Sequence, residues 1–233
     1  FILSQGFLHV ENGEIVEGNG DPILLRGFGL GGWLVPEGYM LQNLGYIEGF
    51  ESPTEIENHI ENLIGPDLAE EFWTLYRSSY VNKSDIDQLA DWGMNHIRVP
   101  FHYKQFSEEP GMVNPLGYEI VDSLISWCEP YNMYIILDMH CAPGAQNGGP
   151  ISDSDGTARL WLEEGFKEHA IEIWQSIATY YSDHTLIGGY DLINEPVLPD
   201  GISSMDLREL YIDITNAIRE VDQNHIIYVE GNW

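Results

Sequence analysis

The chain has 233 residues, 43% of them hydrophobic, which is typical of a folded globular protein and long enough for one large domain. Its 38 acidic residues outnumber nine basic ones, and the formal net charge of −29 at pH 7 argues against nucleic acids and anionic membranes as partners, because both need a cationic protein surface. Either adaptation to salt or an ordinary acidic secreted protein would give such a charge.

The first half of the chain begins with a predicted hairpin and continues into helices. Residues 1–22 are expected to form a small β-hairpin, because short apolar stretches flank the turn residues Glu11-Asn12-Gly13. The apolar run 23–28 predicts a first buried strand. Residues 53–92 are expected to be helical, with Ser84 as the N-cap of a last helix that ends before Gly93.

Strands and amphipathic helices then alternate to the end of the chain. The predicted elements are strand 96–99, helix 115–131, strand 134–139, helix 157–181, strand 187–193, helix 203–221 and strand 226–229. Buried strands separated by amphipathic helices predict a parallel sheet with helices outside it. No glycine-rich phosphate loop follows the first strand, which disfavours a nucleotide-binding fold.

Three polar side chains are expected at the carboxyl ends of the second, third and fourth strands, where parallel α/β folds do their chemistry: Arg98, His140 and Glu195. Glu195 lies in Asn194-Glu195-Pro196, directly after an apolar run, and a carboxylate partly desolvated there can act as a general acid. Structural roles are the alternatives: an ion-pair partner for Arg98, a core histidine for His140 and a loop acid for Glu195.

Four segments together resemble glycoside hydrolase family 5, most closely its exo-β-1,3-glucanase-like branch. They are LRGFGLGGW at 25–33 followed by Glu37, NHIRVPF at 95–101, LDMHCAPGAQNG at 137–148 and LINEP at 192–196. The family usually has glycine where this chain has Cys141. Because all four occur in the expected order on the expected strands, the match is far more specific than any single motif.

The resemblance implies an α/β fold of the (β/α)8 TIM-barrel type. Only about the first five β/α units are expected in this chain, as one catalytic-barrel domain at 1–233 with the hairpin at 1–22 and barrel strands 1–5 at 23–233. A closed barrel cannot stop after its fifth strand without exposing a sheet edge, so we expect a missing C-terminal barrel segment.

The resemblance also implies roles for individual residues in a retaining glycosidase. Glu195 is the expected acid/base, Asn194 binds the sugar 2-hydroxyl, Arg98 orients the nucleophile and His140 hydrogen-bonds the sugar. The expected nucleophile belongs to a seventh strand that is not in this sequence.

Four more residues are expected to bind substrate: Glu37, Trp33, Asn147 and Glu230. The alternative for Glu37 is an ordinary loop acid. Trp33 and Trp161 could each stack on a sugar ring, and the alternative for both is a core residue. Glu230 ends the fifth strand, which is not the family's place for the nucleophile. No metal and no cofactor are expected.

The expected function is hydrolysis of β-1,3-glucan or short β-glucosides. A β-1,4-glucanase and a non-catalytic carbohydrate-binding barrel are the alternatives. Residue 1 is Phe1 and no basic-then-apolar leader is present, so we expect a processed chain of a secreted or periplasmic protein.

The two cysteines, Cys128 and Cys141, are expected to remain free thiols. About seven strand residues separate them, roughly 23 Å of extended chain. A disulfide needs Cα atoms within about 7 Å of each other.

Overall fold

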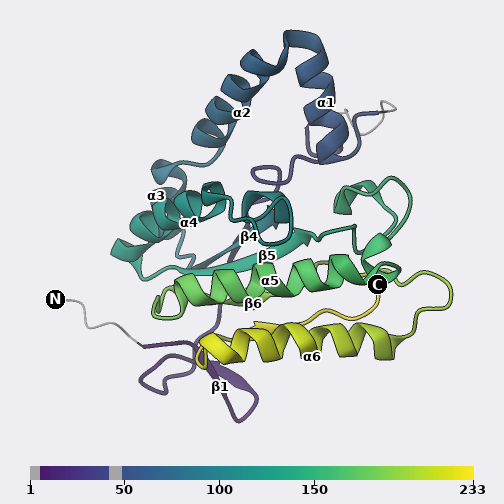
Figure 1. Cartoon of the computed structure of the whole chain (residues 1–233). Coiled ribbons are helices and arrows are strands. Elements are labelled where there is room, and N and C mark those ends of the chain that lie inside the picture. The colour runs from purple at the N-terminus through teal and green to yellow at the C-terminus, as the bar shows by residue number, and fades with distance from the viewer. Residues whose placement is uncertain (1–5, 42–48) are drawn as a thin grey trace.

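A five-stranded parallel sheet forms the centre of the protein (Figure 1). The structure, a computed structural model, describes residues 6–41 and 49–233. The strands follow one another across the sheet in chain order: β3 (Gly27–Gly29), β4 (His96–His102), β5 (Tyr134–Cys141), β6 (Ile187–Asp191) and β7 (Ile227–Tyr228). Every neighbouring pair is parallel, which confirms the predicted sheet.

Helices connect the strands. They are α1 (Pro53–Ile64), α2 (Pro66–Tyr80), α3 (Lys83–Asp91), α4 (Pro115–Cys128), α5 (Glu164–Tyr181) and α6 (Ser204–Val221). In Figure 1, α5 and α6 run side by side along the sheet, while α1 and α2 form a pair that rises away from it. None of the helices in the described ranges is long and apolar enough to span a membrane.

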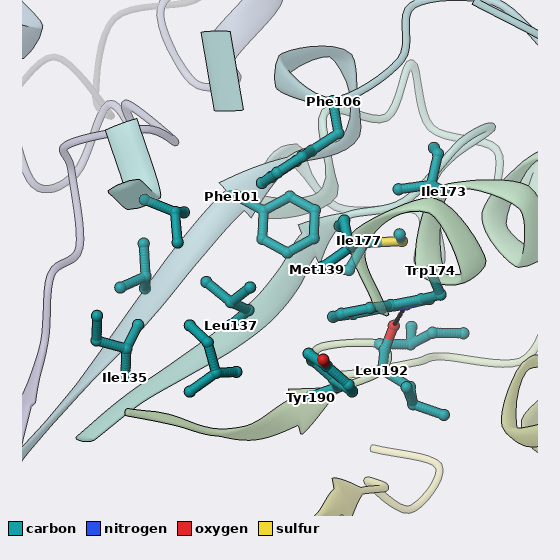
Figure 2. Close-up of a cluster of buried hydrophobic side chains, with 14 of the residues drawn as sticks. Phe101, Phe106, Ile135, Leu137, Met139, Ile173, Trp174, Ile177, Tyr190 and Leu192 are labelled. Carbon is teal, nitrogen blue, oxygen red and sulfur yellow. Dashed lines mark hydrogen bonds between the residues drawn. The ribbon is translucent and has the colours of Figure 1, made fainter. Parts of the chain in front are cut away.

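The main core lies between the sheet and helices α3, α4, α5 and α6 (Figure 2). Successive side chains of a strand point to opposite faces, so Ile135, Leu137 and Met139 of β5 all enter this core. The indole Nε1 of Trp174 on α5 donates to the Leu192 carbonyl oxygen at 3.0 Å, which ties the helix to the chain just after β6. The even-numbered residues of β5 are therefore left to face the other side of the sheet.

A second, smaller cluster covers the amino-terminal end of the sheet. The antiparallel strands β1 (His9–Glu11) and β2 (Glu14–Val16) form the predicted hairpin. Leu8, just before it, packs against Tyr134 at the start of β5 and Ile226 just before β7. Residues 1–5 of the predicted hairpin segment lie outside the described residues.

Several predicted boundaries were wrong for local reasons. The N-cap of α3 is Asn82, not Ser84, because the Asn82 side chain accepts the Ser84 backbone N–H. Helix α5 begins at Glu164 rather than 157, since residues 159–161 form a separate 3₁₀ turn. The first barrel strand is shorter than predicted and covers only 27–29.

Both cysteines are buried free thiols, as predicted. Cys128 is the last residue of α4, and Cys141 is the last residue of β5. Burial raises the pKa of the Cys128 thiol to about 12, so this side chain stays protonated at neutral pH.

Candidate active site

Arg98 is the centre of a polar cluster on the face of the sheet opposite the core. It is the third residue of β4, so it lies within the strand and not at its end as predicted. Its guanidinium contacts Asp138 Oδ2 at 3.0 Å, Asp191 Oδ2 at 2.9 Å and Glu230 Oε1 at 3.2 Å. It also donates to Asn194 Oδ1 at 2.9 Å. One cation therefore links side chains that come from β5, β6 and the chain after β7.

Charge and burial set the protonation of this cluster. Burial and the negative charge of Asp138 raise the pKa of Asp191 to about 6, although Arg98 acts in the opposite direction. Burial alone would lower the pKa of Arg98, but its three carboxylate neighbours raise it above its ordinary value. The guanidinium is therefore a permanent cation shared by carboxylates that repel one another.

His140 follows Asp138 by two residues on β5, so both side chains lie on the same face. Its Nδ1 lies 2.8 Å from Asp138 Oδ2 and its Nε2 3.2 Å from Glu37 Oε1. Burial lowers the pKa of His140, but the hydrogen bonds to these two carboxylates outweigh it and raise the pKa to about 9. At neutral pH both ring nitrogens are therefore protonated donors.

Glu195 occupies a tight turn that follows β6. Its backbone has φ of 41°, in the left-handed region, and Pro196 comes next. Such a conformation costs about 1–3 kcal/mol in a residue other than glycine and persists only where neighbouring groups enforce it. The Glu195 N–H donates to Glu230 Oε2 at 2.8 Å, and the Glu195 carbonyl oxygen accepts from Asn147 Nδ2 at 3.1 Å.

Gln146 joins the loop after β5 to the turn that carries Glu195. This side chain is fully buried, and its Nε2 donates to the His140 carbonyl oxygen at 2.6 Å and the Asn194 carbonyl oxygen at 2.8 Å. Its Oε1 accepts the Ala142 N–H at 3.0 Å. The amide therefore holds two adjacent strand ends at a set distance from each other.

Sequence reasoning missed Asp138, Asp191 and Gln146 as members of this cluster. Both aspartates lie inside otherwise apolar runs, where a buried carboxylate needs a charged partner. The two-residue spacing of Asp138 and His140 was a usable signal for a shared face.

The structure brings together seven of the predicted site residues through the contacts given above: Glu195, Asn194, Arg98, His140, Glu37, Asn147 and Glu230. It does not bring Trp33 to them. That side chain is 3% exposed and its indole N–H donates to the Arg77 carbonyl oxygen at 2.8 Å. Trp161, also 3% exposed, donates to the Gln146 carbonyl oxygen. Both tryptophans therefore fit the core alternative.

Glu37 is nearly as inaccessible as the tryptophans, with 2% of its surface exposed. Its Oε1 contacts His140, and its Oε2 is buried. Glu37 thus helps to orient the His140 ring and to keep its Nε2 protonated. Within the described ranges, no three His, Cys, Asp or Glu side chains are grouped as they would be around a metal ion.

The chain belongs to glycosyl hydrolase family 5, because residues 54–233 match the family model "Cellulase (glycosyl hydrolase family 5)". This confirms the resemblance drawn from the motifs. A "Beta-xylosidase" from Phanerodontia chrysosporium is 33% identical over 232 residues, 98% of this chain and 47% of that protein. A "Probable glucan 1,3-beta-glucosidase A" from Aspergillus fumigatus is 28% identical over 90% of this chain and 50% of its own length.

Solved structures give the same fold. The rutinosidase from Aspergillus niger matches with a TM-score of 0.75 at 19% identity, over 89% of this chain and 62% of its own. The described sheet and helices are thus part of an α/β barrel. The chain spans about half the length of the curated relatives it matches.

Proposed function

We propose that this chain is part of a retaining β-glycosidase whose substrate is a β-1,3-glucan or a short β-glucoside. The observation that carries the proposal is the position of Glu195, which is held after β6 beside Asn194, Arg98 and a protonated His140. Family membership supports the reaction type, and the relative named as a glucan 1,3-beta-glucosidase supports the linkage.

In the proposed mechanism, Glu195 first gives its proton to the departing glycosidic oxygen and then, as a carboxylate, activates water. Asn194 is oriented by Arg98, which binds its Oδ1 and so directs its N–H donors away from the guanidinium. Those donors are suited to the sugar 2-hydroxyl, a contact that strengthens in the transition state. His140, whose two N–H groups are bound by Asp138 and Glu37, supplies a positive charge beside the same sugar.

A retaining mechanism also needs a nucleophilic carboxylate roughly 5–5.5 Å from the acid/base. Glu230 is poorly suited to this role, since one oxygen is bound by Arg98 and the other by the Glu195 N–H. We propose that a segment outside this sequence supplies the nucleophile and completes the barrel. Arg98 would then hold that carboxylate's charge as it holds those of Asp138 and Asp191.

A β-xyloside is the second candidate substrate, because the relative with 33% identity over 98% of this chain is named as a β-xylosidase. The two sugars differ by one hydroxymethyl group, so the pocket around that group decides between them. The ratio of kcat/KM for an aryl β-glucoside to that for an aryl β-xyloside measures this preference. Products from laminarin and from cellulose oligomers separate β-1,3 from β-1,4 cleavage.

The test of the proposal is the release of reducing sugar by the full natural protein and its Glu195→Gln variant. We expect the variant to lose about 10²–10⁴-fold in rate, the usual contribution of a positioned general acid. The first product seen by NMR should have the β configuration. Glu209→Gln, a change at an exposed residue of α6, is the control and should retain full activity. An active Glu195→Gln variant, or an α product, would overturn the proposal.

A further inference from the structure

The backbone of Glu195 is in a conformation that this residue does not adopt by itself. Four other non-glycine residues have positive φ among those described: Asn12, Asn132, Ala145 and Asp153. Asparagine and aspartate tolerate the left-handed region because their short polar side chains bond locally, whereas glutamate gains no such bond. The ring of Pro196 restricts the conformation of Glu195 further. Neighbouring groups must therefore maintain this turn.

Two side chains hold Glu195 from opposite sides. Strand β6 lies between β5 and β7 in the sheet, and each neighbour contributes one contact. From the loop after β5, Asn147 Nδ2 donates to the Glu195 carbonyl oxygen at 3.1 Å. From the chain after β7, Glu230 Oε2 accepts the Glu195 N–H at 2.8 Å. Both backbone polar groups of Glu195 are thus bound by side chains.

Each holding residue is itself held in place. Asn147 is 4% exposed, and its Oδ1 accepts the Gly149 N–H at 2.8 Å and the Ser152 hydroxyl at 3.0 Å. Glu230 Oε1 accepts from Arg98, and the Tyr211 hydroxyl donates to the Glu230 carbonyl oxygen at 3.0 Å. The polar atoms of both side chains are thus already hydrogen-bonded within the protein.

We propose that Asn147 and Glu230 are positioning residues that form a clamp on the backbone of Glu195 and so aim its carboxyl group at the glycosidic oxygen. The inference rests on the proposed acid/base role of Glu195 and reassigns two residues expected to bind substrate. The Cα–Cβ direction of Glu195 follows from its φ. Release of either contact lets the turn relax and moves the carboxyl group out of reach of the leaving-group oxygen.

The test compares two β-glucosides that differ in their leaving group, and therefore in whether the departing oxygen needs a proton. Phenyl β-glucoside has a poor leaving group that requires general acid help, whereas 2,4-dinitrophenyl β-glucoside departs without it. The value of kcat/KM reports the steps up to departure. In the full natural protein, Glu195→Ala should lower kcat/KM by about 10²-fold or more for the phenyl substrate. It should leave the dinitrophenyl substrate nearly unaffected.

Asn147→Asp is the sharpest variant of the clamp, because it removes the donor to Glu195 and keeps the oxygen that binds Gly149 and Ser152. Asn147→Asp and Glu230→Ala, each as a single variant, should lower kcat/KM for the phenyl substrate by about 10-fold or more. Neither should lower kcat/KM much for the dinitrophenyl substrate. Glu230→Gln keeps an oxygen that can accept the Glu195 N–H and should recover much of that loss. Glu209→Ala on the exposed side of α6 is the matched control.

Equal losses on the two substrates, or no loss, in the clamp variants would overturn the proposal. If Glu230→Ala does not fold, as judged by thermal melting followed by circular dichroism, Asn147→Asp decides. If Glu195→Ala itself lacks the leaving-group dependence, the proposed function fails. The clamp is then tested separately by the Glu195 φ in a crystal structure of Glu230→Ala, where a value still near 41° would contradict it.

Discussion

At the scale of single residues, the site is governed by an excess of carboxylates around few cations. Arg98 contacts Asp138, Asp191 and Glu230, so one positive charge is shared among three acids. As pH falls through about 6, Asp191 takes up a proton and the cluster loses one negative charge. Asp138 also contacts His140, which makes that aspartate the link between the two cationic side chains of the site.

The first prediction concerns the proton on His140. Its ring signals should titrate near pH 9 by NMR, and Asp138→Asn should lower that midpoint toward the ordinary value of about 6.5. The pKa of His140 is higher in the folded than in the unfolded state. Its contribution to the free energy of unfolding is therefore complete below about pH 6.5 and disappears as pH rises through about 9.

His169 provides an internal control for this titration. Burial lowers its pKa, and its Nε2 lies 2.8 Å from the Ser107 hydroxyl. Its midpoint should be the same in the natural protein and in Asp138→Asn. A His140 midpoint that does not move in the variant would show that Asp138 does not hold the proton.

At the scale of elements, α6 illustrates how local sequence sets a boundary. The Ser203 side chain accepts the Met205 N–H, and the Asp206 carboxylate accepts the Ser203 N–H at 2.7 Å, which makes a reciprocal cap. The predicted start at 203 agrees with this geometry to within one residue. The buried face of α6 then follows the helical repeat, with Leu207, Leu210 and Ile214 facing the core.

The second prediction follows from this cap. Ser203→Ala should lower the free energy of unfolding by about 1 kcal/mol, because N-terminal backbone donors of α6 lose their side-chain partner. Urea unfolding of the two proteins measures the difference. Ser204→Ala, one residue later at an exposed position, should change the value by less than about 0.5 kcal/mol. Equal effects of the two substitutions would exclude capping as the cause.

The contrast between α6 and the start of α5 shows what the sequence can predict. Periodic apolar residues and nearby caps act within a few positions, so the order of strands and helices and the position of α6 were predictable. Helix α5 starts seven residues later than predicted because Trp161, just before it, donates to the Gln146 carbonyl oxygen, 15 residues earlier in the same loop between β5 and α5. Contacts of that kind depend on the completed fold.

The site shows the same division. The motifs singled out Glu195, Asn194, Arg98 and His140, and the strand ends predicted roughly where Glu195 and His140 lie, whereas Arg98 lies within β4. The partners of Arg98 were not predictable, since Asp191 and Glu230 are 93 and 132 residues away from it along the chain. The left-handed backbone of Glu195 was likewise hidden, because the residues that bind it, Asn147 and Glu230, lie in the segments that follow β5 and β7.

At the scale of the whole molecule, the formal net charge of −29 weakens the folded state through self-repulsion. The third prediction is that Tm rises steeply with NaCl. Salt shortens the screening length from ~10 Å at about 0.1 M to ~3 Å at about 1 M. Scanning calorimetry across this range measures the effect. A Tm that stays flat up to molar NaCl would remove the idea that the charge is an adaptation to salt.

The N-terminal hairpin and the site lie at opposite ends of the same strands. Leu8 and Tyr134 close one end, whereas His140 and Glu195 lie toward the other. Selection can therefore act on the two ends independently. Substitutions around Leu8 and Tyr134 can change stability without altering the side chains of the site, and loops at the other end can diversify without loss of the packing at the hairpin end. The layout thus gives a lineage two separate directions in which to evolve.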